Sequence, residues 1–161
     1  MEVTNSNFKH ALSQWASGVS VVTYPVEGGS ISGVTVSAFS SLSMEPPLIL
    51  VCIQNASASS LWMEKTKKFC VNILTENQIE ASKIMSNPIA DRSAFLKDLG
   101  CREAFDHPLI IPDCMANLIC ELESIHSGGD HKICIGKVVK IEVSDHKRPL
   151  LYFSKDYHYI Q

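Results

Sequence analysis

The chain has 161 residues, with 17 acidic and 14 basic side chains and a formal net charge of −3. A chain of this length can bury about two thirds of its unfolded surface, so we expect one domain over residues 1–161 that needs no metal or disulfide for stability. The negative charge, without any long run of Lys or Arg, argues against nucleic acid, which requires a clustered basic surface.

The cysteine and hydropathy patterns indicate a cytoplasmic protein that makes no use of a membrane. No charged and apolar leader opens the chain, and no apolar run approaches the roughly 20 residues of a membrane helix. The cysteines lack the paired two-residue spacing of zinc sites, so we interpret them as reduced, buried thiols. They are Cys52, Cys70, Cys101, Cys114, Cys120 and Cys134.

The first third of the chain predicts one helix followed by three strands. Phe8, Leu12 and Trp15 recur at the spacing of one helix face, with Thr4 or Asn5 as the cap and a helix end at Gly18. We expect Trp15, and Trp62 on the next helix, to pack against the fold. Short segments rich in β-branched residues predict strands at 19–24, 31–37 and 48–53, with a turn at Gly28-Gly29.

The middle third predicts two helices around one strand, followed by an irregular connection. The helices are expected at 57–66 and after Thr75, which forms a capping-box pattern with Gln78 and is followed by an apolar face of Ile79 and Ile84. The strand between them is expected at 69–74. Three prolines and mixed charges at 87–113 favour a long irregular segment with a short helix at 92–99.

The last third returns to strands. Apolar and polar residues partly alternate at 117–126, and a period of two at 132–143 places one apolar set on a single strand face. That set is Ile133, Ile135, Val139, Ile141 and Val143. Many strands, few helices and no repeating βαβ order predict a mainly β fold, a closed antiparallel β-barrel with peripheral helices.

The stretch from Gly33 to Ser43 is the most informative part of the sequence. It joins two β-rich apolar segments through many small hydroxyl side chains, and Pro46-Pro47 then sets an extended entry into the next strand. Either this is an ordinary hairpin whose hydroxyls bond their own backbone, or it is a surface that binds a flat polar ligand. The residues alone favour these two interpretations, the hairpin and the binding surface, equally.

Five motifs in a fixed order resemble the flavin reductase family, which provides the reductase component of two-component flavin monooxygenases. The first is the stretch just described, from Gly33 through Thr35-Val36-Ser37-Ala38 to Pro46-Pro47. The others span nearly the whole chain: Phe8, Ala11 and Leu12 with residues 18–23; residues 69–74; Gly129-Asp130-His131; and residues 149–153. The resemblance implies an FMN-binding split barrel with Greek-key antiparallel order, usually a homodimer.

The resemblance and the small side chains point to the same residues for the flavin ring. Thr35, Val36, Ser37 and Ala38 leave backbone amides and carbonyls free for the polar edge of the ring, and Ser41 with Leu42 would continue that contact. Cys52 either lies beneath the ring or packs the strand, and packing is the favoured interpretation.

A flavin phosphate is expected after the third strand. Ser57 and Ser59 precede a helix, where free amides and the dipole favour an anion, and they match the family's two-residue spacing at this point. N-capping is the alternative role, and Asn55 would assist. Arg92 suits paired phosphate oxygens, although the family places phenylalanine directly after its basic residue, so a surface salt bridge stays open for it.

The resemblance places His131 beside a nicotinamide, after a turn made by Gly129 and Asp130. His131 starts a strand on a face where a structural residue would more often be apolar, so we expect it to contact the carboxamide or the reduced flavin. Tyr152 and Tyr157 would close over the site. The family has glycine between these tyrosines where this chain has Ser154-Lys155-Asp156, so a core or dimer contact is the alternative for Tyr152.

The expected reaction is NAD(P)H-dependent reduction of FMN or FAD by hydride transfer, supplying a separate monooxygenase or another acceptor. This chemistry belongs to the cofactors, and the chain offers no nucleophile elbow and no metal-ligand spacing. Two alternatives keep the barrel: a flavoprotein that holds FMN tightly as an oxidase or electron carrier, and a non-enzymatic barrel that binds flavin or haem. The choices between FMN and FAD and between NADH and NADPH stay open.

Overall fold

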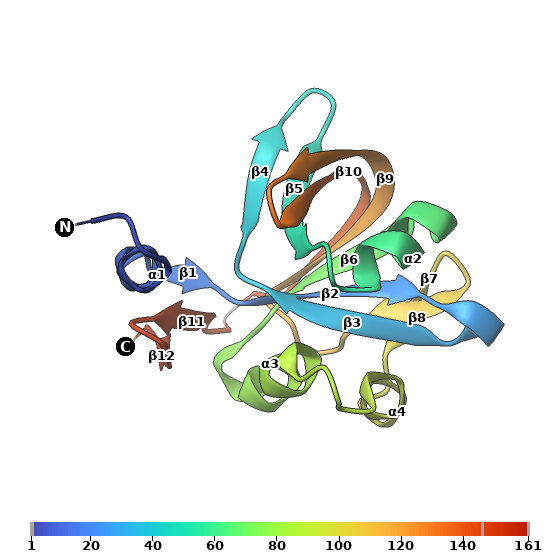
Figure 1. The fold of residues 1–161 in the computed structure, drawn as a ribbon. Coiled ribbons are helices and arrows are strands. Elements are labelled where there is room, and N and C mark those ends of the chain that lie inside the picture. The colour runs from blue at the N-terminus through green and yellow to red at the C-terminus, as the bar shows by residue number, and fades with distance from the viewer. Residues whose placement is uncertain (1, 146, 161) are drawn as a thin grey trace.

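Seven antiparallel strands form the main sheet of the computed structural model, which describes residues 2–145 and 147–160. The strands are β2 (Ser20–Pro25), β3 (Ile31–Val36), β4 (Phe39–Ser43), β5 (Leu48–Gln54), β6 (Lys68–Ile73), β9 (Ala116–Gly128) and β10 (His131–Val143). Their order is β3-β2-β6-β9-β10-β5-β4 (Figure 1). In this order β9 and β10 lie between β6 and β5, which is a Greek-key arrangement. The expected mainly β fold is confirmed.

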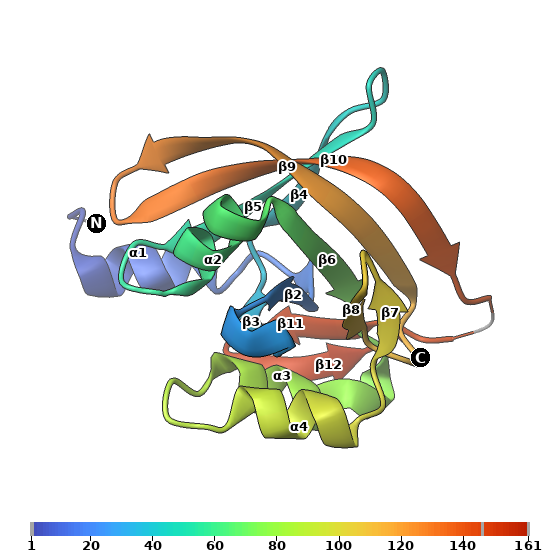
Figure 2. The ribbon, with the colours of Figure 1, turned by 90° about the vertical axis from the view of Figure 1, so that its right-hand side faces the viewer.

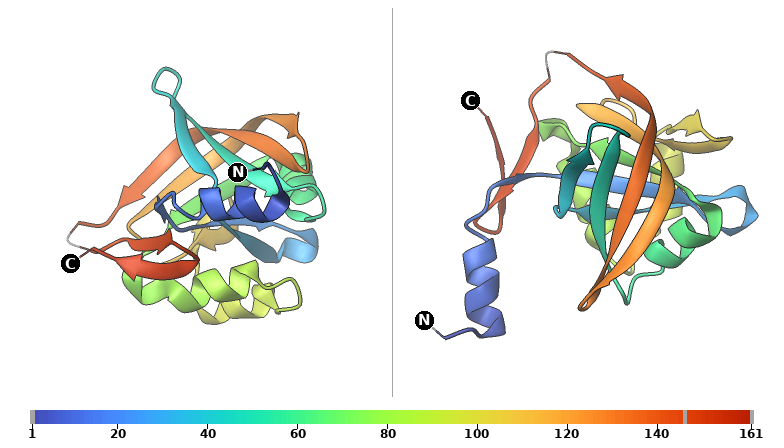
Figure 3. Two further views of the ribbon diagram at one scale, coloured as in Figure 1. Left: turned by 60° about the vertical axis from the view of Figure 1, so that its left-hand side comes forward. Right: turned by 90° about the horizontal axis from the view of Figure 1, so that it is seen from above.

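The sheet is curled (Figure 3), and the strands at its two edges, β3 and β4, follow one another in the chain. Ser37 and Ala38 alone connect them, and they therefore form a seam between the two edges. The sheet is split here, because β3 pairs with β2 and β4 pairs with β5 but the two edges do not pair with each other.

Two hydrophobic cores lie on opposite sides of β2, and this explains why all six of its residues are buried. Val22 and Tyr24 pack in the core beneath α2 (Ser59–Thr66), whereas Val21 faces the core under α3 (Ile79–Ser86) and α4 (Arg92–Asp98). Figure 2 shows α3 and α4 together on one side of the strands and α2 on the other. Trp62 packs against the first of these cores as expected, and it is half-buried.

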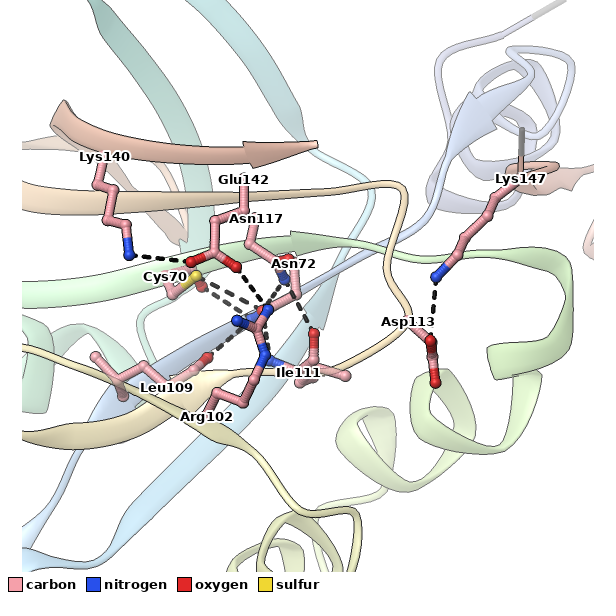
Figure 4. A network of polar contacts seen from close by, with 10 residues as sticks. All are labelled: Cys70, Asn72, Arg102, Leu109, Ile111, Asp113, Asn117, Lys140, Glu142 and Lys147. Carbon is pink, nitrogen blue, oxygen red and sulfur yellow. Dashed lines mark hydrogen bonds and ion pairs between the residues drawn. The ribbon is translucent and has the colours of Figure 1, made fainter. Parts of the chain in front are cut away.

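A buried polar network ties the strands to the connection that follows α4 (Figure 4). The Asn72 amide on β6 donates to the carbonyl of Val21 at 3.1 Å and to the hydroxyl of Thr23 at 3.0 Å. Its oxygen accepts from the backbone N–H of Ile111 at 2.9 Å and from the Asn117 amide at 2.8 Å. One side chain thus joins β2, β6 and β9 to the segment after β8.

Smaller elements surround the sheet. A three-stranded sheet holds β1 (Ser17–Gly18), β11 (Leu150–Phe153) and β12 (Asp156–Tyr159) beside α1 (Asn5–Leu12), near both ends of the chain. Single 3-10 turns occur at η1 (Glu27–Gly29) and η2 (Glu76–Gln78). The Gly28-Gly29 turn is confirmed by positive φ at both glycines. Among the described residues, no helix has both the length and the apolar character required to cross a membrane.

Three expectations about local structure are wrong. Thr4 caps α1 as predicted, but the helix ends at Leu12 rather than near Gly18, which lies in β1. Phe8, Leu12 and Trp15 are exposed, at 58%, 57% and 77%, because α1 stands apart from both cores. Within the described residues of one copy, these side chains therefore stay largely uncovered.

The connection 87–113 is also more regular than predicted. The short helix is present as α4, and it is followed by a hairpin of β7 (Arg102–Ala104) and β8 (His107–Ile110). These strands are too short to show a period of two in the sequence. Their turn requires positive φ at Phe105 and Asp106, and neither residue is a glycine that would have indicated a turn.

The third wrong expectation concerns the face of β10. The pairing with β9 shifts twice. The extra residue at Ile135/Gly136 lies in β9, whereas the extra residue at Val138/Lys140 is Val139 in β10, and it breaks the period of two that the sequence suggests. Cys134 and Gly136 are the residues that face the core, and the aromatic ring of Phe69 fills the space where a side chain at Gly136 would lie. Val139, Ile141 and Val143 are exposed instead, at 43%, 57% and 70%.

Candidate functional site

A cavity of about 720 Å³ opens where the seam of the barrel meets the loop after β5 and the β9–β10 hairpin. Its lining combines small, polar and basic residues from segments far apart in sequence. Expected site residues that line it are Thr35, Val36, Ser37, Ala38, Cys52, Ser57, Arg92 and His131. The remaining lining residues are Val34, Ile53, Gln54, Ala56, Ala58, Ser86 and Pro88.

Asn55 joins two walls of this cavity. Its backbone N–H donates to the carbonyl of Asp130 at 2.9 Å, and its side-chain amide donates to the carbonyl of Gly129 at 3.1 Å. Gly129 has a φ of 68°, which suits glycine, so the predicted hairpin turn is confirmed. Asn55 does not line the cavity, and its role is to hold the loop that carries Ser57 beside the turn that carries His131.

The seam, Ser37 and Ala38, forms part of the cavity wall. The N–H of Cys52 donates to the carbonyl of Ala38 at 3.0 Å, so the seam lies against β5. Ser37 and Ala38 are exposed, and Cys52 is half-buried. The Thr35 hydroxyl donates to the carbonyl of Ser82 on α3 at 2.7 Å. This residue therefore anchors β3 to α3 as well as lining the cavity.

Arg92 supplies positive charge to the cavity lining. Its Nε donates to the carbonyl of Asn87 at 3.2 Å, and its Nη1 donates to the carbonyl of Gly33 at 3.0 Å. The ion pairs found among the described residues do not include Arg92. The surface salt bridge considered from sequence is thus not formed, and the charge has no carboxylate partner in that part of the chain.

The two predicted serines have different positions. Ser57 is half-buried and lines the cavity, whereas Ser59 is buried behind it as the first residue of α2. The Ser57 hydroxyl accepts from the N–H of Ser59 at 3.2 Å. This bond closes a short turn before α2, whereas the N-cap of the helix is Ala58, which makes no side-chain cap bond, so the capping alternative is wrong. The Ser57 side chain instead lines the cavity together with Arg92.

His131 pairs with the exposed Asp130 next to it. Its Nδ1 lies 2.7 Å from the Asp130 carboxylate, and this contact holds the pKa of Asp130 below its ordinary value, by hydrogen bonding first and by charge second. Asp130 itself does not line the cavity. Because Nδ1 is engaged by the carboxylate, Nε2 is the ring nitrogen left for a ligand.

Four other expected site residues lie outside the cavity. Ser41 and Leu42 are exposed on β4. Tyr152 lines a second hollow of about 680 Å³, beside Trp15 and Lys155, and this hollow shares Ser37, Ala38 and Cys52 with the first. Tyr157 donates to or accepts from the Ser82 hydroxyl at 2.9 Å and packs edge-to-face on Tyr152, with ring centroids 5.4 Å apart.

The turn between those tyrosines forms without the glycine that the family has at this point. Ser154 and Lys155 have φ of 51° and 69°, the conformation of the two central residues of a type I′ hairpin turn. The β11–β12 hairpin therefore keeps the turn that glycine would favour, although its residues are not glycine.

Sequence reasoning missed the side of the cavity formed by α3 and the segment after it. Ser86 is the last residue of α3, and Pro88 lies in the segment 87–113 for which the sequence predicted an irregular connection. Ala56 and Ala58 had a weak signal, since they alternate with Ser57 and Ser59 in a loop where small residues leave the backbone accessible.

Comparison with known proteins decides the family. The model of the flavin reductase like domain matches residues 12–161. The chain belongs to this family. NADH:riboflavin 5′-phosphate oxidoreductase of Streptomyces pristinaespiralis is 34% identical over 155 residues, covering 94% of this chain and 86% of the relative. The reductase component of 4-hydroxyphenylacetate 3-monooxygenase of Thermus thermophilus is 33% identical over 150 residues, covering 93% of each.

The solved structures agree with the family assignment. Flavin reductase PheA2 superposes with a TM-score of 0.88 at 30% identity, and the alignment covers 99% of both chains. The split barrel expected from the sequence is therefore shared with a member of the flavin reductase-like family along its full length.

Proposed function

We propose that this member of the flavin reductase-like family reduces FMN or FAD with hydride from NADH or NADPH, and that the flavin binds in the cavity of about 720 Å³. One observation carries the proposal: the cavity lining combines the small residues of the seam with Ser57 and with an arginine that has no carboxylate partner among the described residues. A flavin phosphate has matching parts, a flat tricyclic ring joined to a dianion. The residues present therefore fit the group.

The chain's own residues act by binding and orientation. When bound, the flavin supplies the chemistry of accepting a hydride, and the nicotinamide supplies the hydride. Arg92 and Ser57 would hold the phosphate, which fixes how far the ring reaches along the seam. Ser37 and Ala38 offer backbone groups to the polar edge of the ring, and their small side chains leave the ring face uncovered.

The second hollow is suited to the nicotinamide. It shares Ser37, Ala38 and Cys52 with the first, so a ring bound there would lie against a ring bound at the seam. Fast transfer needs the reacting atoms to be about 3–3.5 Å apart, and such positioning is the main contribution expected from the protein. Nε2 of His131 would bind the carboxamide or the reduced flavin, while Asp130 holds the imidazole through Nδ1.

The proposal includes a homodimer, an oxygenase partner and a cytoplasmic location. Val139, Ile141 and Val143 form an exposed apolar row on β10, and a second copy of the chain is the occupant that we propose for it. An oxygenase partner is supported by relatives named as reductase components of monooxygenases. Six free cysteines favour a reducing compartment such as the cytoplasm. The whole chain, residues 1–161, acts as one functional domain.

Steady-state oxidation of NADH and NADPH with FMN or FAD tests the reaction. The wild-type protein should oxidise at least one nicotinamide faster than flavin alone does, and failure with both nicotinamides and both flavins would overturn the proposal. A protein that retains flavin through purification and oxidises no nicotinamide would support the non-enzymatic alternative.

The phosphate position is tested by Arg92→Ala. We expect the affinity for FMN to fall by about tenfold, the value of one lost charge-assisted hydrogen bond, with riboflavin affinity unchanged. Arg148→Ala is the matched control, because it removes an exposed arginine that pairs with Glu76 far from the cavity. Equal losses for FMN and riboflavin would place the phosphate elsewhere.

The dimer is tested by analytical ultracentrifugation. The wild-type protein should sediment as a dimer and Ile141→Glu as a monomer, because the charge would be buried at the interface. A monomeric wild type would refute the proposed role of the β10 row.

A further inference from the structure

Three hydroxyl groups form a hydrogen-bonded series that runs from the core to the cavity. The Tyr24 hydroxyl on β2 lies 2.8 Å from the Ser59 hydroxyl, which lies 2.6 Å from the Ser57 hydroxyl. Tyr24 is 3% exposed and Ser59 is 1% exposed, whereas Ser57 lines the cavity. We call this series, Tyr24 to Ser59 to Ser57, the hydroxyl relay.

The buried end of the relay sets the direction of its hydrogen bonds. Ser59 is the partner that the described residues provide for the Tyr24 hydroxyl. If Tyr24 accepted from Ser59, its own proton would have no acceptor there, and a buried unpaired donor is costly. A phenol is also a better donor than an aliphatic alcohol. Tyr24 therefore donates to Ser59, and Ser59 donates to Ser57.

With the hydrogen bonds in this direction, the Ser57 hydroxyl can form a further hydrogen bond only as a donor. A hydroxyl has two acceptor lone pairs and one donor proton. The Ser57 oxygen accepts from the Ser59 hydroxyl and from the Ser59 N–H at 3.2 Å, so both lone pairs are in use. Its proton is the only capacity left, and it is available to a ligand in the cavity.

We propose that Tyr24 is a positioning residue that fixes Ser57 as a hydrogen-bond donor and thereby selects flavins that carry a phosphate over those that do not. An anion accepts hydrogen bonds and donates none, so a fixed donor favours it, whereas the ribityl hydroxyl of riboflavin both donates and accepts. The proposal rests on the proposed function, because it assumes that the phosphate lies beside Ser57 and Arg92.

The sequence at Tyr24 supports a role beyond packing. Tyr24 is part of an otherwise apolar core that includes Val22, Val36 and Met63, where phenylalanine would fill the same space without a hydroxyl to satisfy. Ser60, the next residue after Ser59, is fully buried and its hydroxyl has no partner among the described residues. Ser60 thus provides a matched hydroxyl outside the relay.

Tyr24→Phe tests the proposal through dissociation constants measured by quenching of flavin fluorescence. We expect the affinity for FMN to fall by about fivefold, since the donor from Ser57 is weakened rather than removed, while the affinity for riboflavin stays unchanged. Ser60→Ala should change neither affinity. Thermal unfolding of each variant verifies that it is folded.

Ser59→Ala interrupts the relay at its second member and keeps the test decisive if Tyr24→Phe is unstable. It should lower FMN affinity in the same direction, and the double variant should lose no more than the larger single loss, because both changes act through Ser57. Equal losses for FMN and riboflavin, or additive losses in the double variant, would overturn the proposal.

The outcome separates the relay from the proposed function. If the wild-type protein binds FMN more tightly than riboflavin but oxidises no nicotinamide, the proposed reaction fails while the relay is still judged by the binding measurements. If Arg92→Ala weakens FMN selectively and Tyr24→Phe does not, the phosphate position holds and the relay is refuted.

Discussion

Replacing Asn72 by alanine should destabilise the protein by about 3 kcal/mol, although Asn72 lies outside the cavity. The variant removes the side-chain oxygen that accepts from the N–H of Ile111, a fully buried residue. A buried donor left without an acceptor costs about 2 kcal/mol. It also removes donations to Val21 and Thr23, and these are worth about 1 kcal/mol beyond the competing bonds to water.

Asn117→Ala provides the comparison. Asn117 donates to Asn72 at 2.8 Å and to the carbonyl of Ile111 at 3.1 Å, so its removal leaves only acceptors unpaired. We expect a loss of about 1 kcal/mol for this variant. Urea denaturation followed by circular dichroism gives both free energies of unfolding, and Asn72→Ala should also lower the melting temperature by about 9 °C.

The contrast between the two variants tests the reasoning. Equal losses for Asn72→Ala and Asn117→Ala would show that the orphaned Ile111 N–H is not the dominant cost. A change in FMN affinity of folded Asn72→Ala would show that the network also shapes the cavity, contrary to the position of Asn72 between the strands (Figure 4).

Three further predictions concern reactivity, turn geometry and pH. A thiol reagent should modify Cys52, which lines the cavity, before Cys101, because burial raises the pKa of Cys101 to about 11, and bound FMN should slow the reaction at Cys52; equal rates would contradict this. Ser154→Gly should raise the free energy of unfolding by about 0.5 kcal/mol, measured in urea, because Ser154 has a φ of 51°; a loss would show that its side chain matters. Arg102 and then Lys140 hold the pKa of Glu142 below its ordinary value, so the ion pair stabilises the fold above that ordinary value and the benefit is lost as pH falls through the lowered one. Arg102→Ala should therefore be destabilising near neutral pH, and its penalty should shrink as the pH is lowered and Glu142 becomes protonated; a penalty independent of pH in acid would contradict the assignment.

The elements that could be predicted from sequence are those whose signal is local. The capping-box pattern at Thr75 is present, with the Gln78 side chain accepting from the Thr75 N–H at 2.9 Å, and β3 and β5 lie where β-branched residues predicted them. The face of β10 was not predictable, because an extra residue at Val139 interrupts its period. This register shift depends on pairing with β9, which no window of sequence contains.

The candidate site shows the same division. The sequence pointed to Ser37, Ser57, Arg92 and His131, which all line one cavity. The approach of Ser57 to His131 depends on hydrogen bonds from Asn55 to the turn at residues 129–130, a contact between segments more than 70 residues apart. The different roles of Ser57 and Ser59 also required the structure, because their two-residue spacing does not show which one is buried.

The different roles of the residues that line the cavity follow from the chemistry proposed for it. Hydride transfer between two cofactors needs no acid, base or nucleophile from the protein, so side chains have their largest effect on which ligand binds and how far it enters. The lining accordingly includes Arg92 and Ser57, which we propose hold the phosphate, while the seam at Ser37 and Ala38 has small side chains. Substitutions of Arg92 or Ser57 should then change flavin affinity. Larger side chains at the seam should slow transfer at saturating flavin, because they separate the two rings.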